Sequence, residues 1–320
     1  MQRYAIALDL GGTTLKYAVV NSQGEILHAG KLPTPATEGA EAVLAQMTLA
    51  VDRCVVFAHE KGYALEGVGV GTPGVISEDE RVVLGGAENI EGWEMVPLSE
   101  RIEAHCGLPT WVNNDANLMA LGETMFGAGK GASDVVFLTI GTGIGGGVLI
   151  DGKLWGGYRN RGTEFGHMTV KYDGEECACG SVGCLEHYAS TSALVRRFKA
   201  RCEELQRPCE AADGEQIVAL YHAGDPLACE VMEEHWNILA LGLVGIIHIF
   251  SPEKVVIGGG ISEAGPFYIE ALRRRVERRA MAVSREGCEL VAATLGNRAG
   301  VLGAAALAFA KGVERPVSDC

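Results

Sequence analysis

Four side chains that could bind a metal occur in one short stretch of the chain. They are those of His167, Cys177, Cys179 and Cys184. Three thiolates and one imidazole form a closed tetrahedral zinc site, and Gly180 and Gly183 give the backbone between the cysteines the freedom to turn tightly. Because such a site leaves the metal no open position, we expect the zinc ion to fix a loop and not to catalyse a reaction. The alternative is four unrelated residues, with the cysteines as buried thiols.

A carboxylate lies on each side of this cluster, and another lies in a polar segment earlier in the chain. Glu164 precedes the histidine, and Glu186 follows the last cysteine. The polar segment reads N-N-D-A-N and places Asp115 between a predicted strand, 108–112, and a predicted helix that ends at 126. Catalytic groups often lie where a strand of an α/β sheet ends. Asp and Asn are also good helix N-caps, but the segment has more polar residues than one cap needs.

Two glycine-rich turns each connect two predicted strands. The first, D-L-G-G-T-T, runs from Asp9 to Thr14, and the second, G-T-G-I-G-G-G, runs from Gly141 to Gly147. Such turns can cradle a phosphate through backbone N–H groups, although G-G also occurs in ordinary β-hairpins. A strand follows the glycines in both, so neither is a Rossmann motif, and neither has the G-K-[ST] of a Walker A loop. A third run, Gly258 to Gly260, precedes a predicted helix, 262–281, an order that suits a nucleotide.

The spacing of apolar residues predicts two halves with the same plan. The predicted strands are 4–8, 15–20, 25–32, 65–70, 108–112, 135–140, 148–150, 254–257 and 289–293. The predicted helices are 38–61, one that ends at 126, 192–205, 214–222, 226–250, 262–281 and 300–311, with a frayed tail at 312–320. The order strand, glycine turn, strand recurs after about 130 residues. We also expect Gly242 and Gly245 to be points of close packing, and the small residues of the Ala-rich helix 300–311 to allow close packing as well. Asn89 is expected in a loop, E-N-I-E-G-W, that either contacts a carbohydrate or packs inside the protein.

Composition excludes several classes of function. The chain has 320 residues, 48% of them hydrophobic, and a net charge of −14. Nucleic-acid binding requires clustered Lys and Arg, and the longest basic run is 273–275. The longest apolar run, 238–250, is too short and too rich in glycine to span a bilayer, and the N-terminus lacks the apolar core of a signal peptide. We therefore expect no nucleic-acid partner, no membrane partner and a cytoplasmic location.

Cysteine usage agrees with that location. Ten cysteines without a signal peptide indicate a reducing compartment. We expect seven of them to be free thiols: Cys54, Cys106, Cys202, Cys209, Cys229, Cys288 and Cys320.

With these motifs in place, the chain resembles the ROK family of bacterial sugar kinases and repressors, most closely its glucokinases. The resemblance extends from D-L-G-G-T at Asp9 to G-N-R-A-G-V-L-G-A-A, which begins at Gly296. Its most specific parts are E-F-G-H joined to C-x-C-G-x-x-G-C-L-E, then N-D-A-N and the second glycine turn. It implies an actin-like, ribonuclease H-like ATPase fold of two α/β domains with a cleft between them. The expected domains are 1–118 together with 298–320, and 119–297.

The resemblance also implies a role for each matching residue. Asp115 corresponds to the general base, and the expected contacts with sugar hydroxyls are Asn89, Asn114, Asp115, Glu164, His167 and Glu186. The expected phosphate-binding residues are Asp9, Gly11, Gly12, Thr13, Gly141, Thr142, Gly143 and Gly145, and the nucleoside end is expected at Gly258, Gly259 and Gly260. The ligands of a structural Zn²⁺ ion would be His167, Cys177, Cys179 and Cys184. The implied cofactors are ATP and Mg²⁺, with Asp9 as an outer partner of the magnesium ion.

The implied activity is transfer of the γ-phosphate of ATP to the 6-hydroxyl of a hexose. Glucose is favoured by N-I-E-G-W and by Y-A-S after Glu186, and the alternatives are N-acetylglucosamine and N-acetylmannosamine. One departure is Thr163, which stands where the family usually has Gly and can alter the loop near the sugar. The resemblance implies a homodimer or homotetramer with no nucleic-acid partner.

Two alternatives lack catalytic activity. A sugar-responsive regulator of the same family would carry an N-terminal helix-turn-helix, for which a glycine turn that begins at Asp9 leaves no room. A zinc-stabilised sugar-binding or scaffold protein would not need Asp115 or both glycine turns.

Overall fold

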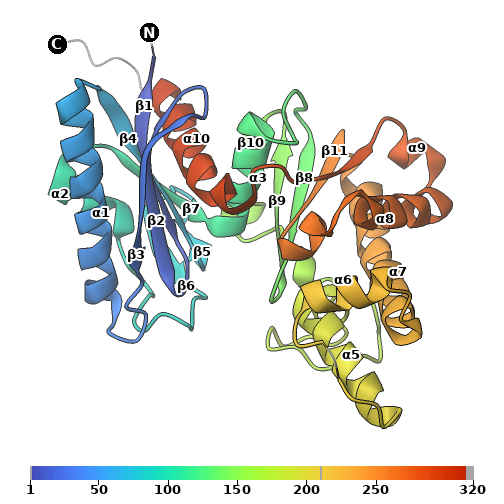
Figure 1. The fold of residues 1–320 in the computed structure, drawn as a ribbon. Coiled ribbons are helices and arrows are strands. Elements are labelled where there is room, and N and C mark those ends of the chain that lie inside the picture. Colours follow the sequence, from blue (N-terminus) through green and yellow to red (C-terminus); the bar gives the residue numbers. More distant parts are fainter. Residues whose placement is uncertain (1, 210, 315–320) are drawn as a thin grey trace.

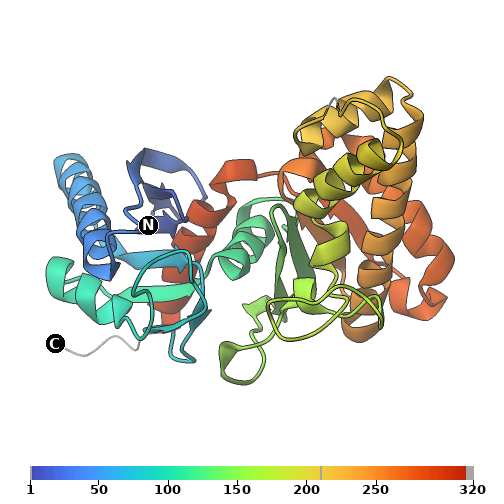
Figure 2. The same cartoon turned by 90° about the horizontal axis from the view of Figure 1, so that it is seen from below.

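The computed structural model describes residues 2–209 and 211–314. Five layers follow one another across the molecule: helices α1 and α2, a first sheet, helices α10 and α3, a second sheet, and a layer of helices that includes α7 and α8 (Figure 1). The helices of the middle layer are α3 (Asp115–Phe126) and α10 (Ala299–Glu314). A view from below shows the same two helices between the sheets (Figure 2). The molecule therefore has two lobes that share an inner layer.

The two sheets have the same topology. The first has the order β3-β2-β1-β4-β7 and consists of β1 (Tyr4–Leu10), β2 (Thr14–Asn21), β3 (Ile26–Pro33), β4 (Leu65–Thr72) and β7 (Thr110–Asn114). The second has the order β10-β9-β8-β11-β12 and consists of β8 (Val135–Ile140), β9 (Ile144–Ile150), β10 (Lys153–Leu154), β11 (Lys254–Gly258) and β12 (Glu289–Ala292). In each, an antiparallel meander is extended by two parallel strands. The prediction of two halves built on one plan is confirmed.

The remaining elements cover the outer faces and the cleft. The other helices are α1 (Ala40–Lys61), α2 (Leu98–Cys106), α4 (Glu186–Ala189), α5 (Thr191–Glu204), α6 (Gly214–His222), α7 (Pro226–Phe250), α8 (Pro266–Arg279) and α9 (Ala282–Arg285). A small hairpin is formed by β5 (Val75–Ile76) and β6 (Val83–Gly85). The 3-10 turns are η1 (Tyr158–Asn160), η2 (Phe165–His167), η3 (Gly260–Ala264) and η4 (Gly296–Arg298). Helix α1 is long and apolar enough to span a bilayer, but one face, with Met47 and Val51, is buried in the core on the first sheet.

Side chains that alternate between the two faces of each strand divide the core into separate layers. In β1, Ile6 and Leu8 belong to the cluster that includes α1 and α2, whereas Ala5 and Ala7 belong to the cluster of the inner layer. Successive side chains of a strand point to opposite faces, so one strand supports both layers. Because the residues on the inner face are small, α10 can lie very close to the sheet. A Cβ atom at Gly69 of β4 would lie 1.7 Å from the carbonyl oxygen of Ala304.

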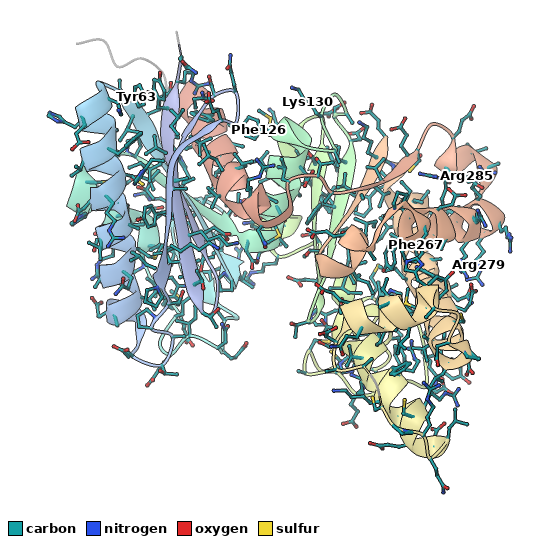
Figure 3. All side chains as sticks on the ribbon, viewed as in Figure 1. Tyr63, Phe126, Lys130, Phe267, Arg279 and Arg285 are labelled. Carbon is teal, nitrogen blue, oxygen red and sulfur yellow. The ribbon has the colours of Figure 1, made fainter. Side chains whose placement is uncertain are left out.

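Helices α3 and α10 contact each other through their backbones. A Cβ atom at Gly303 would lie 1.7 Å from the carbonyl oxygen of Leu118, and one at Gly122 would lie 2.5 Å from that of Ala299. The predicted close packing of the Ala-rich C-terminal helix is confirmed. At the far end of α3, the ring of Phe126 packs on Gly24, where a Cβ atom would approach it to 2.5 Å (Figure 3). Both ends of α3 are therefore fixed, and with them the position of Asp115.

Some predicted boundaries are wrong. The helix predicted for 262–281 begins only at Pro266, after η3 and Gly265, because Gly265 has a φ of +126° and a proline fits best in the first turn of a helix. Gly242 packs against Leu185 as predicted, but Gly245 faces open space. Helix α2 and the β5–β6 hairpin were not predicted. Helix α10 continues to Glu314, and the rest of the predicted tail, with Cys320, lies outside the described residues.

A buried histidine makes the stability of the second lobe sensitive to acid. His235 on α7 is fully buried, and its Nε2 lies 2.7 Å from the hydroxyl of Tyr268 on α8. Burial, with the charge of Arg197, lowers the pKa of His235 to about 3. An unfolded histidine titrates near pH 6.5, so the stability contributed by the neutral ring is complete above that pH. It is lost, by about 1.4 kcal/mol per pH unit, as the pH falls toward the folded-state pKa.

We expect His235→Gln, which can keep a hydrogen bond to Tyr268, to make the Tm depend less on pH between about 6.5 and 4. Thermal unfolding at a series of pH values measures the slope. His222→Gln is the control, because His222 is exposed and its removal should leave the slope unchanged. Equal slopes for His235→Gln and the wild type would contradict the assignment.

Candidate active site

Asp115 is the first residue of α3, directly after β7, but another residue caps the helix. The Oδ1 of Asn114 accepts hydrogen bonds from the N–H groups of Ala116 and Asn117 at 2.9 and 3.4 Å. Its Nδ2 donates to the carbonyl oxygen of Gly74 at 3.1 Å. Asp115 accepts one N–H, from Ala116, at 2.9 Å. Because Asn114 caps α3, the carboxylate of Asp115 is left available for chemistry.

The surroundings of Asp115 favour its protonated form. Burial raises the pKa of Asp115 above its ordinary value of 3.8; the N–H of Ala116 opposes this increase, and the negative charge of Asp9 adds to it. A carboxylate with a raised pKa accepts a proton more readily. Asp9 is itself buried, and its Oδ2 lies 3.2 Å from Nζ of Lys16.

A cavity of about 120 Å³ lies between the two lobes at Asp115. One wall belongs to the first lobe and contains residues 74–76 and 114–117, and the other belongs to the second lobe and contains residues 145–146, 160 and 162–164. Asp115 and Glu164 therefore border the same space from opposite lobes. Asn114 is the third of the predicted sugar-binding residues that line it.

Thr163 lines this cavity with an unusual backbone conformation. Its φ is +68°, and its Oγ1 donates to the carbonyl oxygen of Gly162 at 2.6 Å. Left-handed conformations are disfavoured for β-branched residues and easy for glycine. This backbone requirement explains why the sequence resemblance leads one to expect Gly at this position.

Thr163→Gly should relieve strain of ~1–3 kcal/mol, whereas glycine itself costs roughly 0.5–1 kcal/mol in chain entropy. We expect the free energy of unfolding to stay constant or rise by up to ~2 kcal/mol. Denaturant unfolding measures it, with Thr169→Gly as the control because Thr169 is not among the residues with positive φ. If Thr163→Gly lowers the free energy of unfolding as much as Thr169→Gly does, the backbone at Thr163 is not strained.

The second glycine turn lies at the start of a helix. Residues 11–13 connect β1 to β2, and residues 141–143 connect β8 to β9 in the same way. The N–H of Thr191, the first residue of α5, donates to the carbonyl oxygen of Gly141 at 2.9 Å. Ser190 caps α5 through a 3.1 Å bond from the N–H of Ala193. Since the N-terminal end of a helix favours anions, the second turn is a candidate phosphate site on two grounds.

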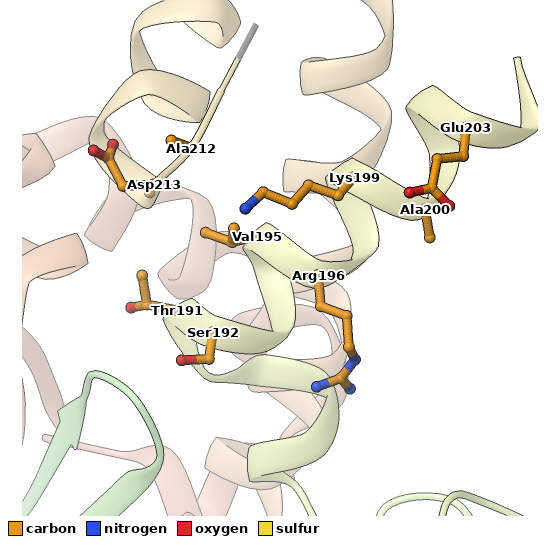
Figure 4. Close-up of a pocket in the computed structure, with 10 residues that line it drawn as sticks. Thr191, Ser192, Val195, Arg196, Lys199, Ala200, Glu203, Ala212 and Asp213 are labelled. Carbon is orange, nitrogen blue, oxygen red and sulfur yellow. The ribbon is translucent and has the colours of Figure 1, made fainter. Parts of the chain in front are cut away.

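A cavity of about 670 Å³ opens beside this turn. It brings Gly141 and Thr142 together with Gly260, whereas a Cβ atom at Gly259 would lie 2.1 Å from the carbonyl oxygen of Ile140. A neighbouring cavity of about 630 Å³ shares four lining residues with it: Thr191, Ser192, Asp213 and Gly214. There Lys199 of α5 extends toward the side that carries Asp213 (Figure 4). Both volumes are typical of small-molecule sites.

The four predicted metal ligands lie together. The donor atoms of His167, Cys177, Cys179 and Cys184 are all within 4.8 Å of one another. Nδ1 of His167 lies 3.6 Å from Sγ of Cys177, and the Sγ atoms of Cys179 and Cys184 are 3.6 Å apart. Zn–S bonds of about 2.3 Å at tetrahedral angles place two sulfur atoms about 3.8 Å apart, so the donor set and its spacing fit zinc. The N–H of Ser181 lowers the pKa of the Cys179 thiol, which favours the thiolate that a metal requires.

Tight backbone turns form this knuckle. Gly180 and Gly183 have φ values of +89° and +68°. This agrees with the prediction that these glycines allow the backbone between the cysteines to turn tightly. A Cβ atom at Gly183 would also lie 1.7 Å from the carbonyl oxygen of Lys171. All nine described cysteines are free of disulfides.

Glu186 connects the knuckle to the second glycine turn. Its Oε1 lies 3.5 Å from Nδ1 of His167 and 3.8 Å from Sγ of Cys177. A Cβ atom at Gly143 would lie 2.6 Å from its Oε2. The neighbouring Leu185 fills the space beside Gly242 of α7, which fixes the start of α4. The knuckle, the carboxylate and the turn therefore form one continuous unit.

The predicted sugar-binding residues lie in three places. Asn114, Asp115 and Glu164 line the interlobe cavity, and His167 and Glu186 lie at the knuckle. Asn89 lies against the first glycine turn, because a Cβ atom at Gly12 would come within 2.6 Å of its Nδ2.

Several lining residues were missed by sequence reasoning. They are residues 74–76 and Asn160 in the interlobe cavity, and Thr191, Ser192, Asp213, Gly214 and Glu263 in the larger one. The N-cap pattern S-T-S at 190–192 was the available signal for Thr191 and Ser192.

The model of the ROK family matches residues 5–311. The chain belongs to the ROK family. It is 37% identical over 315 residues to a glucokinase from Streptomyces coelicolor, with 95% of this chain and 96% of that protein covered.

Solved structures of ROK proteins are similar over almost their whole length. A ROK hexokinase from Thermus thermophilus is 35% identical with a TM-score of 0.82, and 98% of this chain and 100% of that one are covered. A ROK family glucokinase from Streptomyces griseus, in complex with glucose and AMPPNP, is 36% identical with a TM-score of 0.79, with 96% and 99% covered. The predicted actin-like α/β fold with two lobes is confirmed.

Proposed function

We propose that this ROK protein is an ATP-dependent hexose kinase that transfers the γ-phosphate of ATP to the 6-hydroxyl of glucose. The observation that carries the proposal is the interlobe cavity, in which Asp115 and Glu164 face one space beside β9 and its glycine turn. Similarity to a glucokinase from Streptomyces coelicolor and to a glucokinase solved with glucose and AMPPNP supports it.

Asp115 acts as the general base. A hexose hydroxyl is a poor nucleophile at neutral pH, and a carboxylate that accepts its proton accelerates transfer by ~10²–10⁴. The remaining sugar hydroxyls bind to polar side chains: those of Asn89, Asn114, Glu164, His167 and Glu186. Sugars that lack a matching hydroxyl leave such groups unpaired and are rejected.

The glycine turns bind the phosphates of ATP. The N–H groups of Gly11 and Gly141 donate to the carbonyl oxygens of Thr14 and Gly143 at 3.0 and 2.9 Å and so shape the two turns. The phosphates would bind along these turns, at residues 11–13 and at Gly141, Thr142, Gly143 and Gly145, through N–H groups that the turns leave unbonded. The end of the cavity at Gly258, Gly259 and Gly260 would receive the nucleoside. Asp9 would be an outer partner of the magnesium ion. Mg²⁺, when bound, supplies positive charge that offsets the charge spread over the transferring phosphoryl group.

His167 and the three cysteines would hold a structural zinc ion. Nδ1 of His167 faces the cysteines, so Nε2 on the far side of the ring is left for a sugar hydroxyl. Zinc bound there fixes the orientation and tautomer of the ring. The metal thus organises the sugar site and takes no part in the transfer.

Initial rates with ATP and a panel of sugars test the proposal. We expect the highest kcat/KM with glucose, compared with mannose, N-acetylglucosamine and N-acetylmannosamine. A higher kcat/KM for an N-acetylhexosamine would support the kinase activity but would show that glucose is not the preferred substrate. Absence of phosphoryl transfer to every sugar would refute the kinase.

We also propose a cytoplasmic homodimer or homotetramer. Three large apolar side chains at the end of α7 and at the start of α9 are 63–79% exposed, which supports an oligomer: Ile249, Met281 and Val283. The proposed domains remain 1–118 with 298–320, and 119–297. Both boundaries fall in or beside the inner layer, where α3 contacts α10 and β9.

A further inference from the structure

A cavity of about 340 Å³ on the first lobe is rich in positive charge. Three of its lining residues are cationic: Lys16 of β2, Lys31 of β3 and Arg298 of η4. No Asp or Glu occurs among the described residues that line it. The chain as a whole has a net charge of −14, so this concentration of cations runs against its general composition.

Two of these cations, Lys16 and Lys31, lie opposite each other on neighbouring strands and repel each other. Lys16 and Lys31 are direct partners in the antiparallel pairing of β2 and β3, so their side chains leave the same face of the sheet. Like charges directly opposite each other destabilise a sheet. Asp9, the partner of Lys16 on β1, offsets one charge through a 3.2 Å ion pair. Within the part of the chain that the structure describes, Lys31 and Arg298 have no ion pair or side-chain hydrogen bond.

Arg298 belongs to the segment that crosses from the second lobe to the first. This segment leaves β12, passes through η4 and enters α10 (Figure 1). The carboxylate of Glu123 on α3 holds it, accepting the N–H groups of Thr294 and Leu295 at 2.9 and 2.7 Å. Nζ of Lys16 donates to the carbonyl oxygen of Asn297 at 3.3 Å. Arg298 is therefore presented at the cavity by a fixed backbone.

We propose that this cavity binds a small phosphate-bearing anion. A guanidinium group binds two oxygens of one phosphate, and an ammonium group binds a third, which is the combination that Arg298 and Lys31 offer. None of the lining residues is shared with the interlobe cavity or with the larger cavities beside the second glycine turn. An anion held here would bridge β3 and the segment that joins the lobes.

Calorimetric titration of inorganic phosphate, in the presence of saturating AMPPNP and Mg²⁺, tests the site. The nucleotide occupies the proposed ATP site, so heat from phosphate reports a separate one. We expect the double variant Lys31→Gln, Arg298→Gln to bind phosphate at least ~10-fold more weakly than the wild type. Lys153→Gln is the matched control, because Lys153 is an exposed lysine on the edge strand β10 and lines none of these cavities. Its affinity should equal that of the wild type.

Further probes identify the source of the anion. Tighter binding of glucose 6-phosphate than of inorganic phosphate indicates the sugar phosphate if the difference is lost in the Lys31→Gln, Arg298→Gln variant, because the product site at Asp115 is unchanged there. Tighter binding of inorganic phosphate indicates free phosphate. Displacement of phosphate by chloride at equal ionic strength, phosphate binding that appears only when AMPPNP is left out, or unchanged binding in the double variant would each overturn the site.

Discussion

Replacement of Asp115 by Asn should reduce turnover with glucose and ATP by ~10²–10⁴ while glucose still binds. The amide keeps the size and a hydrogen-bonding oxygen but cannot accept the proton of the 6-hydroxyl. Asn114 continues to cap α3 in the variant, since its bonds to Ala116 and Asn117 do not involve Asp115. The loss should therefore appear in kcat and much less in the Kd for glucose, measured by steady-state kinetics and by titration.

The same substitution should not lower stability. The folded-state pKa of Asp115 is raised above 3.8, so the ionised carboxylate is disfavoured by folding, and this cost is fully present at neutral pH. Asn carries no charge, so we expect a Tm equal to or above that of the wild type at pH 7. The acid limb of the pH profile of kcat/KM should lie above the ordinary range of an Asp for the same reason.

Asp151→Asn is the control, because Asp151 is exposed at the turn after β9 and should keep full activity. Near-normal turnover of Asp115→Asn would remove Asp115 as the base. A lower Tm together with lost turnover would show that the residue supports the fold instead.

Residue types and spacing were enough to predict the chemical groups of this site. They were not enough to predict which residues line the interlobe cavity. The cluster from His167 to Cys184 is local in sequence, so its donors were bound to lie near one another. Asp115 and Glu164 come from different lobes, and only the resemblance to a family placed them in one site. Strand β5, which has only two residues, and Asn160, which has a positive φ, supply part of the cavity wall. Such short elements leave no hydrophobic periodicity to detect.

Only part of the packing in and beside the inner layer could be predicted from the sequence. The small residues of α10 indicated close packing, but not that the partners would be backbone atoms of Leu118 and Ala299. Likewise, strand 15–20 gave no hint that Lys16 would pair with Lys31, because the register of β2 and β3 is set by the turn between them. Tertiary placement, and not local propensity, decides both features.

If the knuckle holds zinc as proposed, Cys179→Ser should remove the metal and much of the affinity for glucose. Cys179 is exposed, whereas Cys177 and Cys184 are buried, so a serine at 179 leaves the core unchanged and removes only a metal ligand. Without the metal, the His167 ring and Glu186 beside it lose their fixed position. A lost hydrogen bond to a charged or oriented partner weakens binding by roughly 10- to 100-fold, and kcat should change less than KM.

Metal analysis, glucose titration and thermal unfolding separate the possible roles of the knuckle. Cys209→Ser is the matched control, since Cys209 is exposed and not among the clustered donors, and it should retain zinc, affinity and Tm. Zinc-free Cys179→Ser protein that binds glucose like the wild type would refute the clamp. A drop in Tm with unchanged glucose affinity would leave the metal a purely structural role, because only a clamp that orients His167 and Glu186 makes the loss of zinc visible at the sugar.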